Sequence, residues 1–371
     1  MTPRNRLFLV ASVSATCVAG FFAMQGVGAR AGAGEASSRS SASAAEPSPA
    51  ILDSGVIWGA IKKAAPGDTV RIPPGAYSAL RLDGFKGAGV ITIVSEDPKQ
   101  RVVIRGIHVT NSRGLTFRDM DVTVDPRLGF AVMLGGVQDV RLEGLQLYGS
   151  AIGDGNAVMV RNSANVTVAD SNIHHLGTGL NHLNSDTVEF RGNRLHAIQA
   201  DGIRGGGSSN VTISGNRFTN FYPRPGDHPD AIQFWTRNVA TPSRNILITD
   251  NVFVRGAGGP IQGIFVGNES QITYETVVIR GNSIIGGMYH GISLTNGSNV
   301  VIENNIVQGY ADMTSWISVG KTSNSRMINN SATDYKFPEN KDFQISGNKR
   351  LKLVAIGNDS ILQGSAPPKS R

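Results

Sequence analysis

The chain has 371 residues, of which 45 are glycine, 40% are hydrophobic and only 17% are charged. This composition is too apolar for a disordered chain and too rich in glycine for a helical bundle, because glycine weakens helix interiors. The formal net charge of +7 favours polyanionic partners without naming one. Cys17 is the single cysteine, so the sequence excludes a disulfide framework and a cysteine-based metal site.

The first 50 residues are not expected to belong to the fold. Arg4 and Arg6 precede an apolar run that ends in small residues, which is typical of a secretory signal peptide over residues 1–29. Residues 30–50 are rich in Ala, Gly and Ser and contain too little apolar surface to fold, so we expect a flexible linker. The apolar run is long, which leaves an uncleaved anchor as the alternative. We favour a secreted or periplasmic protein with no stable membrane insertion after the signal is removed.

Residues 54–65 predict an amphipathic helix as the first element of the fold. One helical face carries its apolar residues, namely Val56, Ile57, Ala60, Ile61 and Ala64. Gly67 and Asp68 end the helix, and Thr69–Ile72 predicts the first strand. We expect this helix to cover the open end of a stack of strands.

The rest of the chain is a repeat with starts 22 to 35 residues apart. The same apolar alternation begins at Leu115, Val140, Val166, Val188, Val211, Ile246, Val277 and Val300. A second strand returns once per repeat, as in Asp201–Arg204 and Asp230–Gln233. This pattern predicts a parallel β-helix of nine or ten coils over residues 51–335, with residues 336–371 as a C-terminal tail or cap.

An asparagine recurs after the repeated segments. It stands at Asn193, Asn216, Asn251, Asn282 and Asn305, and Ser171 takes the same place one repeat earlier. We expect these asparagines to adopt the left-handed conformation at a corner and to form a ladder of side-chain hydrogen bonds. They are interpreted as structural residues rather than ligands.

The run from Ile57 to Tyr77, IWGAIKKAAPGDTVRIPPGAY, resembles the N-terminal start of right-handed parallel β-helix polysaccharide lyases. The resemblance is to the pectate-lyase-like superfamily, and most of all to its chondroitinase-B and alginate-lyase branch. It implies an all-β, single-stranded right-handed parallel β-helix with an N-terminal capping helix. The superfamily includes lyases, hydrolases, epimerases and phage tailspikes, so the resemblance supports the fold more strongly than an activity. The element His228-Pro229-Asp230 also resembles, in changed order, the Asp-Pro-His element of mannuronan C5-epimerases.

The repeat is interrupted around one strand. Asn193 and Asp201 are 8 residues apart, but Asn216 and Asp230 are 14 apart. A second excess lies after the strand, between Asp230 and Ile246. Loops on a rigid scaffold are where sites are built, so we expect the functional site here.

Aligning the coils on this strand gives two columns of outward residues. The first reads Gly179, Asp201, Asp230, Gln262 and His290, and the second reads His182, Arg204, Gln233, Phe265 and Ser293. Because neighbouring strands lie about 4.8 Å apart, column neighbours can contact one ligand. We expect one patch of Asp201, Arg204, His228, Asp230, Gln233 and His182, lined by Trp235, Tyr222 and Arg224, with His290 as a groove wall.

Such a patch suits an acidic polysaccharide. A lyase removes the C5 proton of a uronate, which requires a cation on the carboxylate and a base near C5. His228 is the preferred base, Arg204 would neutralise the carboxylate, and Asp201 or Asp230 would orient the histidine or hold a metal. The calcium-binding Asn/Glu cluster of the resembled branch is not matched, since only Glu269 stands in the corresponding region. Ca²⁺ therefore stays an open cofactor, and no metal-binding residue is assigned.

The favoured function is β-elimination on a uronate-containing polysaccharide by a monomeric protein with no nucleic-acid partner. C5-epimerisation, hydrolysis by the Asp201 and Asp230 carboxyls, and non-catalytic carbohydrate binding or export are the alternatives.

Overall fold

The computed structural model describes residues 50–239 and 241–362. The predicted signal peptide and nearly all of the predicted linker lie outside the described residues. In the described range, helix α1 (Gly55–Lys63) is the single α-helix, and Ile57 and Ile61 are buried in the common core. Helix α1 packs against the first coil, as the sequence predicts. No helix in these ranges has the length and apolarity needed to cross a bilayer.

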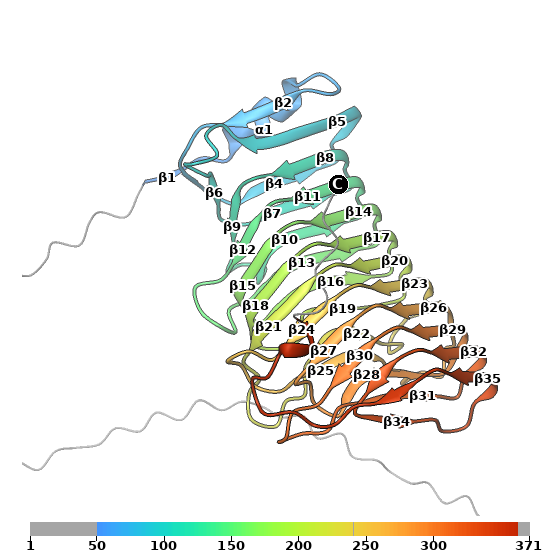
Figure 1. Ribbon diagram of the computed structural model, residues 1–371. Helices are drawn as coiled ribbons and strands as arrows, with labels where there is room; N and C mark the ends of the chain where they lie inside the picture. The colour runs from blue at the N-terminus through green and yellow to red at the C-terminus, as the bar shows by residue number, and fades with distance from the viewer. Residues whose placement is uncertain (1–49, 240, 363–371) are drawn as a thin grey trace, which may run out of the picture. The chain divides into compact units, whose positions relative to one another are not determined.

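Three parallel sheets build the solenoid, and each coil contributes one strand to each sheet (Figure 1). We call them sheets A, B and C. Sheet B contains the repeated apolar segments of the sequence: β2 (Thr69–Ile72), β5 (Lys86–Ser95), β8 (Arg113–Arg118), β11 (Gln138–Glu143), β14 (Ala164–Ala169), β17 (Asp186–Arg191), β20 (Ser209–Ser214), β23 (Arg244–Thr249), β26 (Tyr274–Arg280), β29 (Gly297–Glu303), β32 (Ser323–Ile328) and β35 (Lys341–Ser346).

Sheet A follows sheet B in each coil. Its strands are β1 (Ile51–Leu52), β3 (Ala76–Tyr77), β6 (Val103–Ile104), β9 (Asp121–Thr123), β12 (Gln146–Tyr148), β15 (Asn172–Leu176), β18 (Arg194–Ile198), β21 (Arg217–Phe221), β24 (Val252–Val254), β27 (Ser283–Ile285), β30 (Ile306–Gln308), β33 (Ser331–Ala332) and β36 (Lys349–Arg350). Most of its strands are short because a corner follows after a few residues.

Sheet C begins each new coil and carries the candidate site. Its strands are β4 (Leu80–Asp83), β7 (Ile107–Thr110), β10 (Phe130–Gly135), β13 (Asn156–Arg161), β16 (Thr178–Leu183), β19 (Ile203–Gly206), β22 (Asp230–Phe234), β25 (Gln262–Val266), β28 (His290–Thr295), β31 (Trp316–Gly320) and β34 (Asp334–Lys336).

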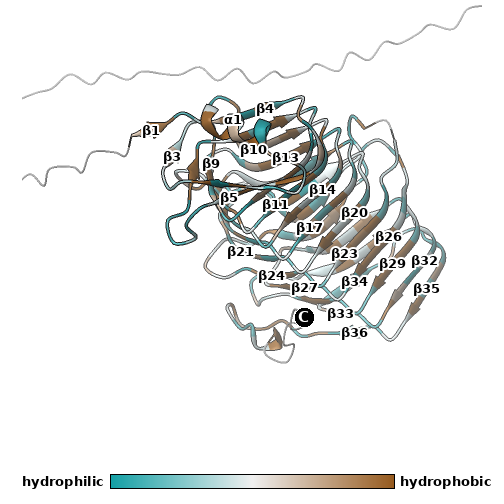
Figure 2. Ribbon diagram, turned by 90° about the horizontal axis from the view of Figure 1, so that it is seen from above, coloured by the Kyte–Doolittle hydropathy of each residue, from teal (hydrophilic) through white to brown (hydrophobic). Residues whose placement is uncertain are grey.

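The core lies inside the stack. Period-2 alternation sends Val, Ile, Leu and Phe side chains inward from all three sheets, so residues such as Phe117, Phe190 and Ile213 have no exposed surface. Figure 2 shows hydrophobic colouring along successive strands of the stack. A parallel stack can bury this surface only by adding coils, which is why the repeat continues over most of the chain.

The asparagine ladder is confirmed. Asn216 donates from Nδ2 to Oδ1 of Asn251 at 2.9 Å, and Asn251 donates in the same way to Asn282 at 3.0 Å. Ser171 joins the ladder, since its backbone N–H donates to Oδ1 of Asn193. The expected left-handed conformation lies one residue earlier, at Asp170, Gly192, Gly215, Asp250, Gly281 and Asn304, with φ between 52° and 65°. That preceding residue turns the chain, and the asparagine side chain then points into the corner.

The solenoid also continues beyond the boundary expected at residue 335, and the count of nine or ten coils is too low. Sheet C alone has eleven strands, and β35 and β36 extend the stack to Arg350. The following segment lies against the 309–312 turn, where Tyr310 donates its hydroxyl to Asp359 and Ala311 donates its backbone N–H to Val354. No further strand follows among the residues described up to 362.

Candidate functional site

The two predicted loops flank β22, where the coil is longest. Residues 222–229 connect β21 to β22, and residues 235–243, of which 240 is not described, connect β22 to β23. The second loop is fixed by Thr236, whose backbone N–H donates to Oε2 of Glu269 at 3.1 Å. Glu269, the acid considered for a calcium site, is thus engaged in holding a loop.

Sheet C presents one continuous outward row across the strands. The register places in this row Arg81, His108, Met133, Met159, Asn181, Arg204, Gln233, Phe265, Ser293, Ser318 and Lys336. Arg204, Gln233 and Phe265 therefore occupy the predicted column. Asn181, not His182, precedes them.

His182 does not belong to the outer patch. Gly205 is its register partner, and its ring lies in the core against Phe190 and Phe234. The side chain is 1% exposed, and neither ring nitrogen has a hydrogen-bond partner in the described residues. Burial lowers the pKa of His182 to about 3, so the ring is neutral. The predicted alignment was wrong by one residue here, which reverses the face that each side chain takes.

Asp201 and Arg204 form the first part of the site. Oδ2 of Asp201 is 3.1 Å from Nη1 of Arg204, and its Oδ1 accepts the backbone N–H of Asp230 at 2.9 Å. Arg204 also donates from Nε to Oδ1 of buried Asn181 at 2.7 Å. The guanidinium is held from two sides, yet 35% of the Arg204 side chain is exposed. It can therefore present its remaining N–H groups to a carboxylate.

Asp230 is the buried acid of the site. It is 1% exposed, and its Oδ2 accepts Nε2 of Gln233 at 2.6 Å. Burial raises the pKa of Asp230 well above its usual value, and the nearby Asp201 carboxylate raises it further, against the hydrogen bond from Gln233. Oδ1 of Asp230 and Oε1 of its register partner Gln262 both lack a hydrogen-bond partner in the described part of the chain. A proton on Asp230 turns one of its carboxyl oxygens from an acceptor into a donor, which suits a carboxyl group this deeply buried.

His228 lies in the loop that leads into β22, one coil after Arg204. The residue is exposed, and its backbone carbonyl accepts Nε2 of Gln262, on the next coil, at 3.3 Å. His228 also lowers the pKa of His290, after the larger effects of burial and of Lys336. Arg204 and His228 therefore belong to neighbouring coils, with Asp230 two residues after His228.

An aromatic cluster adjoins His228, and only part of it was expected. The ring of His290 lies 5.4 Å from Phe265 and 5.6 Å from Trp316, and Nε1 of Trp316 donates to Nδ1 of His290 at 3.3 Å. Lys336 places its ammonium 3.2 Å from the centre of the Trp316 indole. Trp316 was not predicted, because it lies three strands after the interrupted coil. Extending the first predicted column by one strand beyond His290 would have found it, since Trp316 is the register partner of His290.

The other predicted lining residues are more scattered. Trp235 is half-buried, and its indole covers Gly206, where a Cβ would lie 3.0 Å from Nε1. Tyr222 and Arg224 are exposed in the loop before β22. Gln233 contacts Asp230 rather than offering its amide freely. No group of three His, Cys, Asp or Glu side chains in the described residues is arranged to hold a metal ion.

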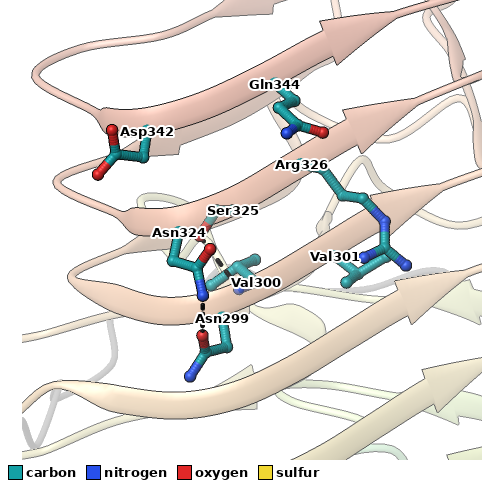
Figure 3. Close-up of a pocket in the computed structure, with 8 residues that line it drawn as sticks. All are labelled: Asn299, Val300, Val301, Asn324, Ser325, Arg326, Asp342 and Gln344. Carbon is teal, nitrogen blue, oxygen red and sulfur yellow. Dashed lines mark hydrogen bonds between the residues drawn. The ribbon is translucent and has the colours of Figure 1, made fainter.

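A separate hollow lies on the outer face of sheet B. It has a volume of about 230 Å³ and is drawn in Figure 3, where Asn324 bonds to Asn299 on the neighbouring coil. Asn299, Asn324 and Asp342 have positive φ values, so this row turns the chain at the edge of the sheet. Arg326 reaches toward the neighbouring strand, beside Val301 (Figure 3), and its guanidinium lies 4.0 Å from Glu303 of that strand. We assign the hollow a structural role.

The fold defines a class of scaffold, the right-handed parallel β-helix. The family profile described as "Right handed beta helix region" matches residues 130–332, so the chain belongs to that family. No curated protein matches the sequence.

Solved structures share the fold at low sequence identity. The A-module of a mannuronan C-5 epimerase from Azotobacter vinelandii is 16% identical over 81% of this chain and 96% of that chain, with a TM-score of 0.59. A family 28 exopolygalacturonase from Yersinia enterocolitica is 14% identical over 83% of this chain and 79% of that chain, with a TM-score of 0.50. An alginate lyase from Paenibacillus is 13% identical over 80% and 97%, with a TM-score of 0.45. At these identities, the epimerase module and the exopolygalacturonase show a shared fold and no shared reaction.

Proposed function

We propose that this protein is an exported enzyme that cleaves an acidic polysaccharide by β-elimination on the outer face of sheet C. The observation that carries the proposal is which of the predicted catalytic side chains are exposed. Among the four predicted catalytic residues, Arg204 and His228 offer side-chain surface to a polymer, whereas Asp230 is 1% and Asp201 8% exposed. Elimination uses an exposed cation and an exposed base, which is the pair that this face provides.

The geometry suggests one arrangement of the substrate. A uronate ring lying over the start of β22 would have Arg204 on the preceding coil and His228 in the loop that leads into β22. Arg204 binds the carboxylate and stabilises the charge that develops when the C5 proton leaves. His228 takes that proton, the C4–O4 bond breaks, a C4–C5 double bond forms, and the departing O4 takes a proton from solvent. Asp201 keeps Arg204 in place.

The aromatic cluster fits the same substrate. Phe265, His290 and Trp316 form a half-buried platform beside His228, and Lys336 adds a positive charge above the indole. Aromatic faces stack on sugar rings, while the ammonium pairs with a uronate carboxylate. Residues 1–29, with their signal-like pattern, would bring the enzyme to such polymers outside the cytoplasm.

The experiment is a screen of uronate polymers, followed by ultraviolet absorbance of the unsaturated product. We expect turnover by the wild type and a loss of about 100-fold or more in His228→Ala. His175→Asn, an exposed histidine on sheet A with positive φ, is the matched control and should keep its activity. Full activity in His228→Ala would refute the assigned base.

Hydrolysis is the second candidate, favoured by one observation. Asp230 has a raised pKa and lies next to ion-paired Asp201, and a carboxyl group with a raised pKa beside a second carboxyl group is typical of the general acid of a glycosidase. Because Asp230 is 1% exposed, contact with a polymer would then require a rearrangement that exposes its carboxyl group. New reducing ends without ultraviolet absorbance would identify this reaction.

A further inference from the structure

The outer face of sheet C carries a second cationic hollow, far from the candidate site. It has a volume of about 340 Å³ and is lined by Arg81, Arg105 and Arg127 together with Asp125. Arg81 belongs to β4, and the other residues lie on the segments that flank the early coils.

The acid in this hollow is already fully engaged. Asp125 is 3% exposed, its Oδ2 lies 2.9 Å from Nη2 of Arg81, and its Oδ1 accepts the backbone N–H of Arg127 at 2.9 Å. Nη1 of Arg81 also lies 2.5 Å from Nδ1 of His108, and burial followed by Arg81 lowers the pKa of that histidine. The carboxylate therefore fixes Arg81 and has no further oxygen to offer.

Arg105 and Arg127 are the free cations of the hollow. Both are exposed, and neither side chain has an ion pair or hydrogen bond within the described ranges 50–239 and 241–362. Three guanidinium groups thus face one carboxylate. Such an excess of donors in a concave site attracts an anion, and guanidinium groups bind carboxylates through two parallel hydrogen bonds.

The hollow and the candidate site lie on one path. Arg81 and Arg204 occupy the same outward row, five strand steps apart, which corresponds to about 24 Å. Met133 and Met159 lie half-exposed between them. Figure 1 shows the strands of this path, from β4 to β19, side by side in the stack. Methionine offers an adaptable apolar surface for the C–H faces of sugars. A polysaccharide chain could therefore lie along this row, in which no acidic residue stands between Arg81 and Arg204.

We propose that Arg81, Arg105 and Arg127 form a distal subsite that binds a carboxylate of the same acidic polysaccharide chain held at Arg204. This inference rests on the proposed function for the identity of the chain. It makes substrate length a determinant of affinity, because only a chain that spans both arginine sites gains the second contact.

The test uses Arg105→Ala combined with Arg127→Ala. The matched control combines Arg194→Ala with Arg217→Ala. It also removes two positive charges, but from exposed arginines on the outer face of sheet A. Affinity is measured by calorimetry with uronate oligomers shorter and longer than the span, in the background of His228→Ala. We expect the hollow variant to bind long oligomers about tenfold more weakly, equivalent to about 1.4 kcal/mol. Short oligomers should bind all three proteins equally.

Two results would overturn the subsite. One is equal weakening in the hollow variant and the sheet A control, which means that net charge alone matters. The other is equal weakening for short and long oligomers, which means that no second contact exists. The assay measures binding, so its result does not depend on the reaction. If the wild type shows no turnover but long oligomers still bind more tightly through the hollow, the subsite is supported and the proposed function is refuted.

Discussion

Replacing Asp230 by asparagine tests the assignment of a neutral, buried acid at the centre of the site. Asp230 accepts one hydrogen bond from Gln233 and faces Gln262 with an oxygen that has no donor in the described residues. An asparagine keeps an acceptor for Gln233, and its amide N–H can donate where a protonated carboxyl group would. Asp230→Asn should therefore fold without leaving a new buried polar group unsatisfied.

The sign of the pH effect follows from the raised pKa of Asp230. The native protein keeps a proton that the unfolded chain releases above a pH of about 3.9. From there up to the native pKa, each pH unit lowers the free energy of unfolding of the wild type by about 1.4 kcal/mol. Asparagine does not titrate, so the advantage of Asp230→Asn should be smallest near pH 4 and should grow as the pH rises.

The assay is urea unfolding at pH 4, 5, 6 and 7, with Asp227→Asn, an exposed residue of the same loop, as the control. A difference between Asp230→Asn and wild type that stays constant with pH would refute the neutral acid. So would a variant that is less stable than the wild type at pH 7. The same variant separates the two reactions, because hydrolysis with Asp230 as the acid should fall by about 100-fold or more, whereas elimination should persist.

Three further predictions concern the ladder, the core and the aromatic cluster. Asn251→Ala removes five buried hydrogen bonds and should lower the free energy of unfolding by about 3–5 kcal/mol. The control, Asn245→Ala on the exposed sheet B row, should lower it by about 1 kcal/mol. Equal thermal midpoints of the two variants would contradict the role of the ladder. Burial lowers the pKa of His182, so the wild type loses stability as the pH falls below about 6.5, by about 1.4 kcal/mol per pH unit. The free energy of unfolding of His182→Leu, relative to that of the wild type, should therefore be higher at pH 5 than at pH 7.5. A difference that does not change with pH would mean that the ring is in water. Trp316→Ala should weaken the binding of uronate polymers by about tenfold, measured by electrophoresis in gels that contain the polymer, with Trp58→Ala on α1 as the control. If the migration of Trp316→Ala in these gels equals that of the wild type, Trp316 is not part of the binding face.

The repeat could be predicted from the sequence because its causes are local. Apolar alternation, glycine at corners and the recurring asparagine each act within one coil, and stacking copies of that coil leaves few alternatives. The interrupted coil could be found in the same way, since the extra residues around Asp230 show as a change in spacing. These signals were enough to place Asp201 and Arg204 on one coil and His228 and Asp230 on the next.

Register and depth were decided only by the tertiary structure. Asn181 and His182 are adjacent polar residues, and either could face outward until the pairing with β19 sends His182 into the core beside Gly205. Asp230 is buried between Asp201 of the preceding coil, which accepts its backbone N–H, and its register partner Gln262 of the next coil, and this burial raises its pKa. The period of two in a strand determines which residues share a face. Which of the two faces meets the core depends on pairing with the neighbouring coil, and no single segment of the sequence specifies that pairing.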